Sequence, residues 1–146
     1  MSGFLTSKIL LGATTFVDHV SDYVYVNLMR DLTLNETLLS KEATEKVMAQ
    51  AGRYVKQYHA DNGRFTDNGF INAIKTKDQN ITFGGVGDHH QNGIIGNKNK
   101  MLTLGDCNIL HHGMQMCPTM IYSMFWPFSM KAVAEMNNKM QIDVMG

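Results

Sequence analysis

An apolar run that stops in a tight turn constrains this chain more than any other feature. Tyr54–His59 carries aromatic and β-branched residues and leads into Asp61-Asn62-Gly63. Apolar residues bounded by Asp, Asn and Gly predict a buried strand that ends in a turn. Such a strand would place the carboxylate of Asp61 at the edge of a sheet, where it is free to take part in chemistry.

Composition limits the classes of protein to which the chain can belong. Its 146 residues fit one domain, 1–146, and a hydrophobic content of 44% is typical of a globular fold. The 13 basic residues balance 13 acidic ones, which weighs against a strong DNA binder, because phosphate contacts need positive charge. The two cysteines form no disulfide framework and favour a reducing compartment. No apolar run is long enough to cross a membrane, and Ile9–Val17 reads as a strand rather than a signal peptide.

The first half of the chain predicts a hairpin followed by a helix. Ala13–His19 and Tyr23–Met29 are β-branched or alternating runs separated by a short link, as in a β-hairpin. Thr33 and Glu36 have the spacing of a capping box, and Gly52 can end the helix that follows. This helix shows one apolar stripe, composed of Leu39, Ala43 and Val47.

The second half predicts a helix, a short strand and two further helices. The expected segments are Thr66–Lys77, Ile81–Phe83, Gln91–His112 and a last helix with Pro118 in its first turn and a kink or restart at Pro127. Gly84–Gly87 is expected to be a mobile loop. It is not expected to bind phosphate, because it lacks the full glycine pattern of a phosphate-binding turn. The alternation of strands and helices predicts a mixed α/β domain.

Four motifs in order resemble the integrase catalytic core of copia-type LTR retrotransposons, a member of the ribonuclease-H-like superfamily. The similarity runs from about Leu5 to Asn137, and the motifs that carry it are Phe16–Tyr23, His59–Phe65, His89–Ile94 and Met124–Pro127. The resemblance implies a ribonuclease-H-like mixed sheet flanked by helices. It also implies DNA integration as the ancestral activity, with a nuclear location if the protein is functional.

The same resemblance implies an incomplete active site. In the family, three carboxylates hold two Mg²⁺ ions that activate the attacking hydroxyl and stabilise the leaving oxygen. The second carboxylate corresponds to Asp61, and Gly96 stands at the third position. The first carboxylate and its central strand are expected to be missing, as in a truncated and degenerate copy. We therefore expect no productive Mg²⁺ binding, and a sheet split where the central strand would lie.

Basic residues near these motifs are candidates for contacts with DNA. They are Arg64, Lys98 and Lys100. Lys100 lies one helical turn beyond Gly96 and fits a phosphate contact, whereas Lys98 points elsewhere and is expected to be solvated. The implied partner is DNA, bound weakly, and exposed strand edges predict a homo-oligomer or aggregation.

Other residues admit a chemical reading and a structural one. Asp18, Asp22 and Asp88 could replace the missing acid, but they read as turn or loop residues. Cys107, His111, His112 and Cys117 could hold zinc, but two ligands on one helix face favour helix packing. The aromatic cluster at Met124, Phe125, Trp126 and Phe128 could stack on bases, but it reads as core.

Three functions follow from these observations. The first is a remnant of an integrase core without strand-transfer activity, in which Asp61 is the remaining catalytic and metal-binding residue. The alternative is a non-enzymatic, domesticated module of the same fold that binds nucleic acid or a partner. The third is an integrase that other chains complete by supplying the missing acid.

Overall fold

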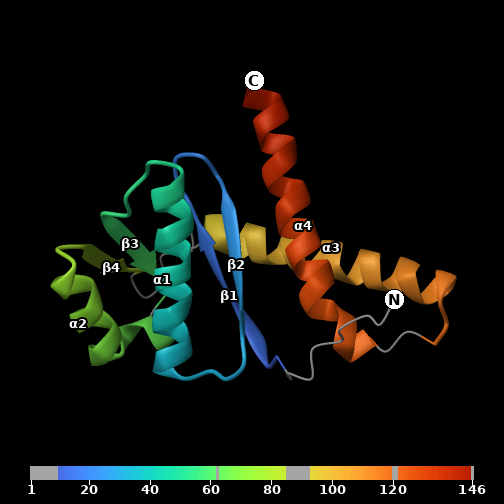
Figure 1. Ribbon diagram of the computed structural model, residues 1–146, viewed down its shortest axis with the longest axis horizontal. Helices are drawn as coiled ribbons and strands as arrows, with labels where there is room; N and C mark the ends of the chain where they lie inside the picture. Colours follow the sequence, from blue (N-terminus) through green and yellow to red (C-terminus); the bar gives the residue numbers. More distant parts are fainter. Residues whose placement is uncertain (1–9, 62, 85–92, 120–121, 146) are drawn as a thin grey trace.

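Two small sheets and the helices around them make up this protein (Figure 1). The computed structural model describes residues 10–61, 63–84, 93–119 and 122–145. Within these ranges strands and helices follow each other in the predicted order, so the fold is mixed α/β as expected. Asp88, most of the expected glycine loop and the first four residues of the His89–Ile94 motif lie outside the described residues. None of the described helices is long and apolar enough to cross a membrane.

The predicted hairpin forms the first sheet. Strand β1 (Gly12–Val17) pairs with strand β2 (Val24–Met29) in antiparallel register, from Gly12 opposite Met29 to Val17 opposite Val24. Asp18 closes the turn, because its carboxylate accepts hydrogen bonds from the backbone amides of Val20 and Ser21. The hydrophobic pattern and the turn residues therefore specify this element locally.

Helix α1 (Leu34–Gln50) begins and ends where the sequence predicts. The side chain of Thr33 accepts a hydrogen bond from the amide of Glu36 and caps the first turn. At the other end Gly52 takes φ +70°, which favours glycine. The amide of Gly52 donates to Ala49 and that of Arg53 to Met48, and this pair of bonds is a Schellman ending.

The buried face of α1 is polar, and here the predicted apolar stripe is wrong. Leu39 is 49% exposed, whereas the residues that face the sheet are Thr37, Ser40, Lys41 and Thr44. The three hydroxyl groups are satisfied. Ser40 accepts from the side-chain amide of Asn27 at 2.6 Å and donates to the carbonyl of Glu36, and Thr37 and Thr44 donate to backbone carbonyls one turn earlier. Small hydrogen-bonded side chains thus let α1 pack on β2 without an apolar stripe.

The second sheet pairs strand β3 (Gln57–Ala60) with strand β4 (Asn80–Phe83) in parallel. Between them lie a short 3₁₀ helix, η1 (Arg64–Thr66), and helix α2 (Asn68–Thr76), whose first turn is capped by the side chain of Asp67. Phe70 and Ile74 of α2 pack against Tyr58 of β3 and close a small apolar cluster. Strand β3 begins three residues later than predicted, and Tyr54 is 79% exposed.

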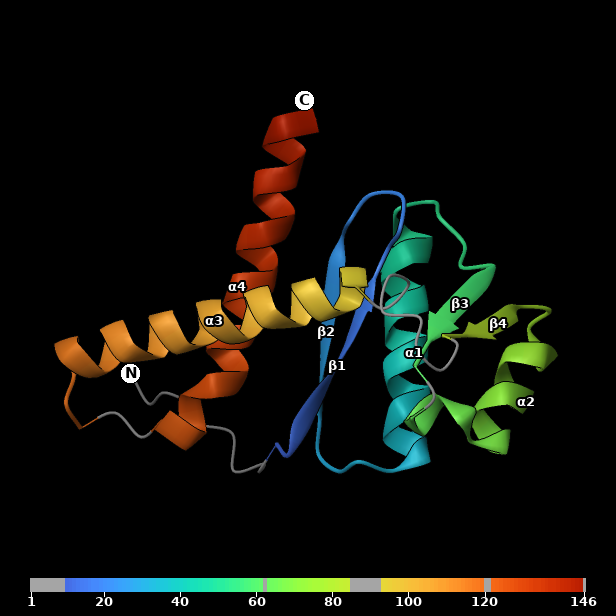
Figure 2. The ribbon, with the colours of Figure 1, turned by 180° about the vertical axis from the view of Figure 1, so that it is seen from behind.

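Helices α3 (Gly93–Met116) and α4 (Tyr122–Met145) cover the hairpin face opposite α1 (Figures 1 and 2). The core on this side consists of Val24, Val26, Leu102, Val133 and Ala134. Gly105 permits the close crossing of the two helices, because a Cβ there would lie 2.7 Å from Cγ1 of Val133. Helix α4 begins after Pro118 rather than at it, and it continues through Pro127.

Several side chains predicted to pack in the interior are exposed instead. Met124 and Phe128 of α4 are 39% and 51% exposed. Cys107, His111 and His112 of α3 also face solvent, so the packing role expected for them is wrong. Trp126 is partly buried. The helix period placed these residues on faces that turn away from the hairpin.

Candidate functional site

A large cleft separates the two sheets. Its volume is about 1550 Å³, and its walls are β1, the strand β3 with the loop that follows it, and the first turns of α3. Trp126 and Met130 of α4 close one side, and Thr37, Thr44 and Met48 of α1 close the other. Within the described part of the chain β1 pairs only with β2 and β3 only with β4, so the sheet is split as predicted. We call this space the inter-sheet cleft.

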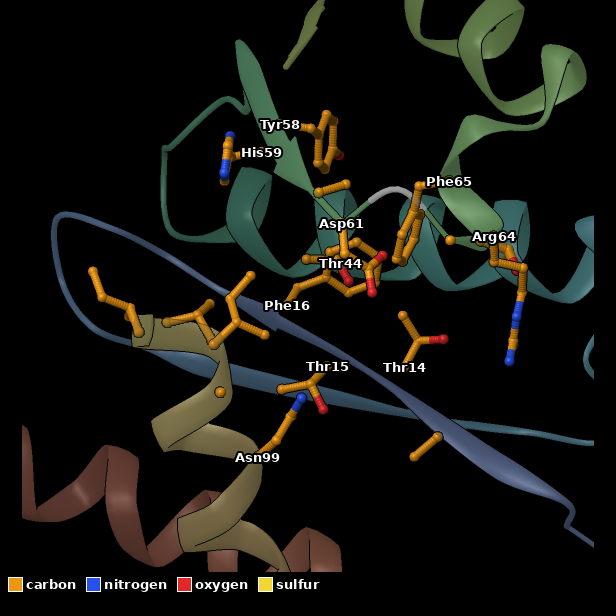
Figure 3. A pocket seen from close by; sticks show the side chains of 18 of the residues that line it. Thr14, Thr15, Phe16, Thr44, Tyr58, His59, Asp61, Arg64, Phe65 and Asn99 are labelled. Atoms are coloured by element: carbon orange, nitrogen blue, oxygen red, sulfur yellow. The ribbon is translucent and has the colours of Figure 1, made fainter. Parts of the chain in front are cut away.

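Asp61 follows the last residue of β3 and points into the inter-sheet cleft (Figure 3). The alternation of the strand sets Asp61 on the same face as His59, opposite the buried side chains of Tyr58 and Ala60. Asp61 is exposed, and the backbone of Gly63 turns close to its carboxylate. The strand-and-turn pattern therefore places a free carboxylate at the cleft, as the sequence predicts.

Gly96 lines the same cleft from α3. Asn99 and Thr103 lie one and two turns further along this face of the helix, and Asn99 projects towards the cleft in Figure 3. A Cβ placed on Gly96 would meet no atom within 4 Å. The site thus brings Asp61 and Gly96 to one space, with room at Gly96 for a larger side chain.

His59 reaches the cleft beside Asp61. Its Nδ1 lies 2.9 Å from the hydroxyl of Thr82 on β4, and this contact orients the imidazole. Nε2 is buried without a hydrogen-bond partner among the described residues. His59 therefore supports the contact between β3 and β4 at this point.

Asp18 also lines the cleft, but the hairpin turn already uses its carboxylate. It accepts from Val20 and Ser21, and it forms an ion pair with Arg53 at 3.2 Å. Burial raises the pKa of Asp18, but the hydrogen bonds from Ser21 and Val20, together with Arg53, outweigh it and lower the pKa below its usual value. Asp18 is thus a turn residue, as predicted.

The donor set does not fit a pair of Mg²⁺ ions. Among the described residues that line the inter-sheet cleft, the acidic ones are Asp61 and Asp18, and Asp18 is engaged in its turn. Across the described ranges no group of three or more His, Cys, Asp or Glu side chains could hold a metal ion. Hard divalent cations take several oxygen ligands, usually including more than one carboxylate. The described residues of the cleft therefore do not form a two-metal site.

The three basic candidates lie in different surroundings. Arg64 is exposed in η1 and lines the cleft, with Nη1 3.9 Å from the sulfur of Met29. Lys98 forms an ion pair with Asp22 in the hairpin turn, and its side chain is only 14% exposed. The expectation that Lys98 is solvated is therefore wrong. Lys100 is exposed on α3 and lies outside the cleft lining.

A polar network that holds β3 against α1 was not predicted. The carboxylate of Glu45 accepts from Lys41 and Lys77 at 2.7 Å each, and from Tyr58 and Gln79 at 2.8 Å each. Burial raises the pKa of Glu45, but these hydrogen bonds outweigh it and lower the pKa to about 2. Burial and the Glu45 carboxylate raise the pKa of the Tyr58 hydroxyl. The i, i+4 spacing of Lys41 and Glu45 was the only local signal for this network.

Comparisons with known proteins identify the fold. No protein-family model and no curated protein matches the sequence. Among solved structures, the chain is similar to the HTLV-2 integrase catalytic core domain in complex with magnesium, in its trimeric and dimeric forms. The TM-scores are 0.57 and 0.56, at 15% identity each, covering 84% of this chain and 78% and 79% of those chains.

A third similar structure is a simian T-cell lymphotropic virus intasome in complex with PP2A regulatory subunit B56 gamma. Here the TM-score is 0.58 at 17% identity, and the match covers 82% of this chain and 45% of that one. At such low identity the likeness concerns the arrangement of the backbone. The chain has a mixed α/β fold like that of retroviral integrase catalytic cores.

Proposed function

We propose that this chain is a remnant of a copia-type integrase core that does not carry out strand transfer. The observation that supports this is that Asp61 and Gly96 both line the inter-sheet cleft. Asp61 supplies one carboxylate, and glycine supplies no ligand at the position where the sequence motif has Glu. A two-metal displacement needs carboxylates that hold both ions, and the described lining of this cleft offers a single free one.

A strand-transfer assay tests the proposal. The chain is incubated with a labelled DNA duplex and Mg²⁺ or Mn²⁺, and nicked or joined products are separated on a gel. We expect no product from the natural chain or from Gly96→Glu, although the open space at Gly96 accommodates the larger side chain. Products from Gly96→Glu that disappear in the double variant with Asp61→Ala would contradict the proposal, because another acid would then complete the site.

The second candidate is a non-enzymatic module that binds a partner or nucleic acid. The size of the inter-sheet cleft favours it, because about 1550 Å³ exceeds the roughly 300–1,000 Å³ of ordinary small-molecule pockets. The balanced charge of the chain argues against DNA as the main partner. Binding that persists in Asp61→Ala and needs no divalent metal distinguishes this candidate from an enzyme.

A further inference from the structure

Two strand edges face the inter-sheet cleft without a strand partner among the described residues. The amide of Asp18 donates to Tyr23 of the hairpin at 2.9 Å. Because ladder bonds alternate along an antiparallel pair, the amides of Ala13, Thr15 and Val17 point the other way, towards the cleft. An extended backbone is the group that satisfies such a row of donors and acceptors.

The second edge belongs to β3. The amides of Asn80 and Gly84 donate to the carbonyls of Lys56 and Ala60, which therefore face β4. The backbone groups of the alternate residues, Gln57 and His59, face the cleft. The cleft therefore lies between two strand edges, that of β1 and that of β3, and each presents backbone amides and carbonyls to it.

Contacts across the cleft show that β1 and β3 run in opposite directions. Asp18, after the end of β1, pairs with Arg53, before the start of β3. The rings of Phe16 and Tyr58 meet edge to face, with centroids 6.3 Å apart. A single strand between these edges would accordingly be antiparallel to one and parallel to the other.

We propose that the inter-sheet cleft binds an extended, uncharged apolar strand of a partner polypeptide, about as long as the six residues of β1. The chemistry of the walls selects this occupant. One wall is aromatic, with Phe16, Tyr58 and Phe65, and the other is apolar, with Leu102 and Trp126. Neither Gly12–Val17 nor Gln57–Ala60 contains an acidic residue, Lys or Arg, so charges in the middle of a bound strand would be buried there without a counter-ion. The charged lining residues Asp18, Asp61 and Arg64 follow the ends of these strands.

The direction of the bound strand follows from the lengths of the two edges. Strand β1 has six residues and β3 has four. Antiparallel pairing is the more stable kind per residue, so the longer edge should take it. The partner strand therefore runs antiparallel to β1 and parallel to β3, with its amino end near Val17.

Peptide binding to the full chain tests this proposal. The probe is a capped six-residue peptide of alternating valine and threonine that carries fluorescein on a glycine spacer. Binding is followed by fluorescence anisotropy and by the emission of Trp126, the single tryptophan of the chain, which lines the cleft. We expect saturable binding that changes both signals. The matched control is the same peptide with alternate amides N-methylated, which keeps the side chains and removes backbone donors, and it should not bind.

Variants at Thr15 locate the bound strand. Thr15→Pro removes one amide that faces the cleft, and proline is tolerated at an edge where the amide makes no ladder bond. We expect Thr15→Pro to weaken binding at least roughly tenfold, and Thr15→Ala, which keeps the amide, to change it by less than about twofold.

Four results would overturn the proposal. Equal binding of the N-methylated peptide would mean that the cleft only attracts apolar side chains, and unchanged binding by Thr15→Pro would place the peptide elsewhere. A Trp126 signal that changes with protein concentration and that saturating peptide does not reverse would make a second copy the occupant, because the peptide and a second copy compete for the same edges. Peptide that binds only after deletion of residues 1–9 would make the chain its own occupant.

Discussion

Asn138 of α4 pairs with both backbone groups of Val24 in β2. Its Oδ1 accepts from the Val24 amide at 2.8 Å, and its Nδ2 donates to the Val24 carbonyl at 2.8 Å. The primary amide thus imitates a strand residue at the outer edge of the hairpin, and all four atoms are buried. This contact joins α4 to β2 and satisfies the backbone of Val24, at the start of an edge that could otherwise pair with another chain.

Asn138→Ala should loosen the start of β2. The substitution leaves two buried backbone groups of Val24 without partners, at about 1–3 kcal/mol each. We expect the Val24 amide to exchange with solvent roughly 10- to 100-fold faster, measured by hydrogen exchange and NMR. Lys139→Ala, at the neighbouring exposed position, is the matched control and should leave this rate unchanged. Equal rates in the two variants would mean that water or another group replaces the amide.

Local chemistry explains which parts of the fold could be predicted. The hairpin, the Thr33 cap and the Gly52 ending depend on residues a few positions apart, and all three are confirmed. The buried face of α1 could not be predicted, because Ser40 and Thr44 bury through hydrogen bonds and close packing rather than through apolarity. The spacing of apolar residues reveals only faces that are buried because they are apolar, so it misses this one.

The candidate site could be predicted only in part, for a similar reason. The turn chemistry places Asp61 at a strand end, and the structure brings Gly96 of α3 to the same cleft. Thr15, Asn99 and Trp126 line the same space, but they come from three elements whose packing no local pattern encodes. The ion pair between Lys98 and Asp22 could not be predicted for the same reason, since 76 positions separate the two residues.

Glu45 should make the contact between α1 and β3 sensitive to acid. Its pKa is about 2 in the folded chain, against an ordinary value of 4.5. A lowered pKa stabilises the fold above pH 4.5, and this contribution is lost as the pH falls from about 4.5 to 2. We expect the Tyr58 amide to lose protection from hydrogen exchange in that window, and Glu45→Gln to lose it already at pH 7.

Glu135→Gln, at an exposed position on α4, is the control and should behave as the natural chain. An NMR titration of the Glu45 carboxyl provides an independent measurement of its pKa. A midpoint near 4.5 would contradict the network of Lys41, Lys77, Gln79 and Tyr58 around this group.

DNA binding should be weak, non-specific and steep in salt. Each phosphate contact contributes about 0.9 to the slope of log affinity against log salt concentration. We expect Arg64→Ala and Lys100→Ala each to lower that slope by about one, measured by anisotropy with a labelled duplex. Lys98→Ala should leave the slope unchanged, because Asp22 already neutralises this lysine within the protein. Submicromolar binding at physiological salt that Lys100→Ala abolishes would favour the nucleic-acid-binding module instead.

The isolated chain should associate with itself. Two strand edges face the inter-sheet cleft, and α3 and α4 expose large apolar side chains, among them Leu104, Met116, Phe128 and Met140. Edges and apolar patches of this kind drive association at micromolar concentrations. Light scattering after gel filtration should show mass rising with concentration, and calorimetry should show no cooperative thermal transition.

Two substitutions separate the two sources of association. Thr15→Lys places a charge on the edge of β1, which is how natural sheets prevent edge pairing, whereas Phe128→Gln removes the aromatic ring exposed on α4. We expect Thr15→Lys to reduce the mean mass more than Phe128→Gln, because a free ladder edge offers a row of directional hydrogen bonds and a single exposed ring offers only apolar area. A purified chain that stays monomeric and unfolds cooperatively would contradict this prediction, since both edges would then be satisfied within one molecule.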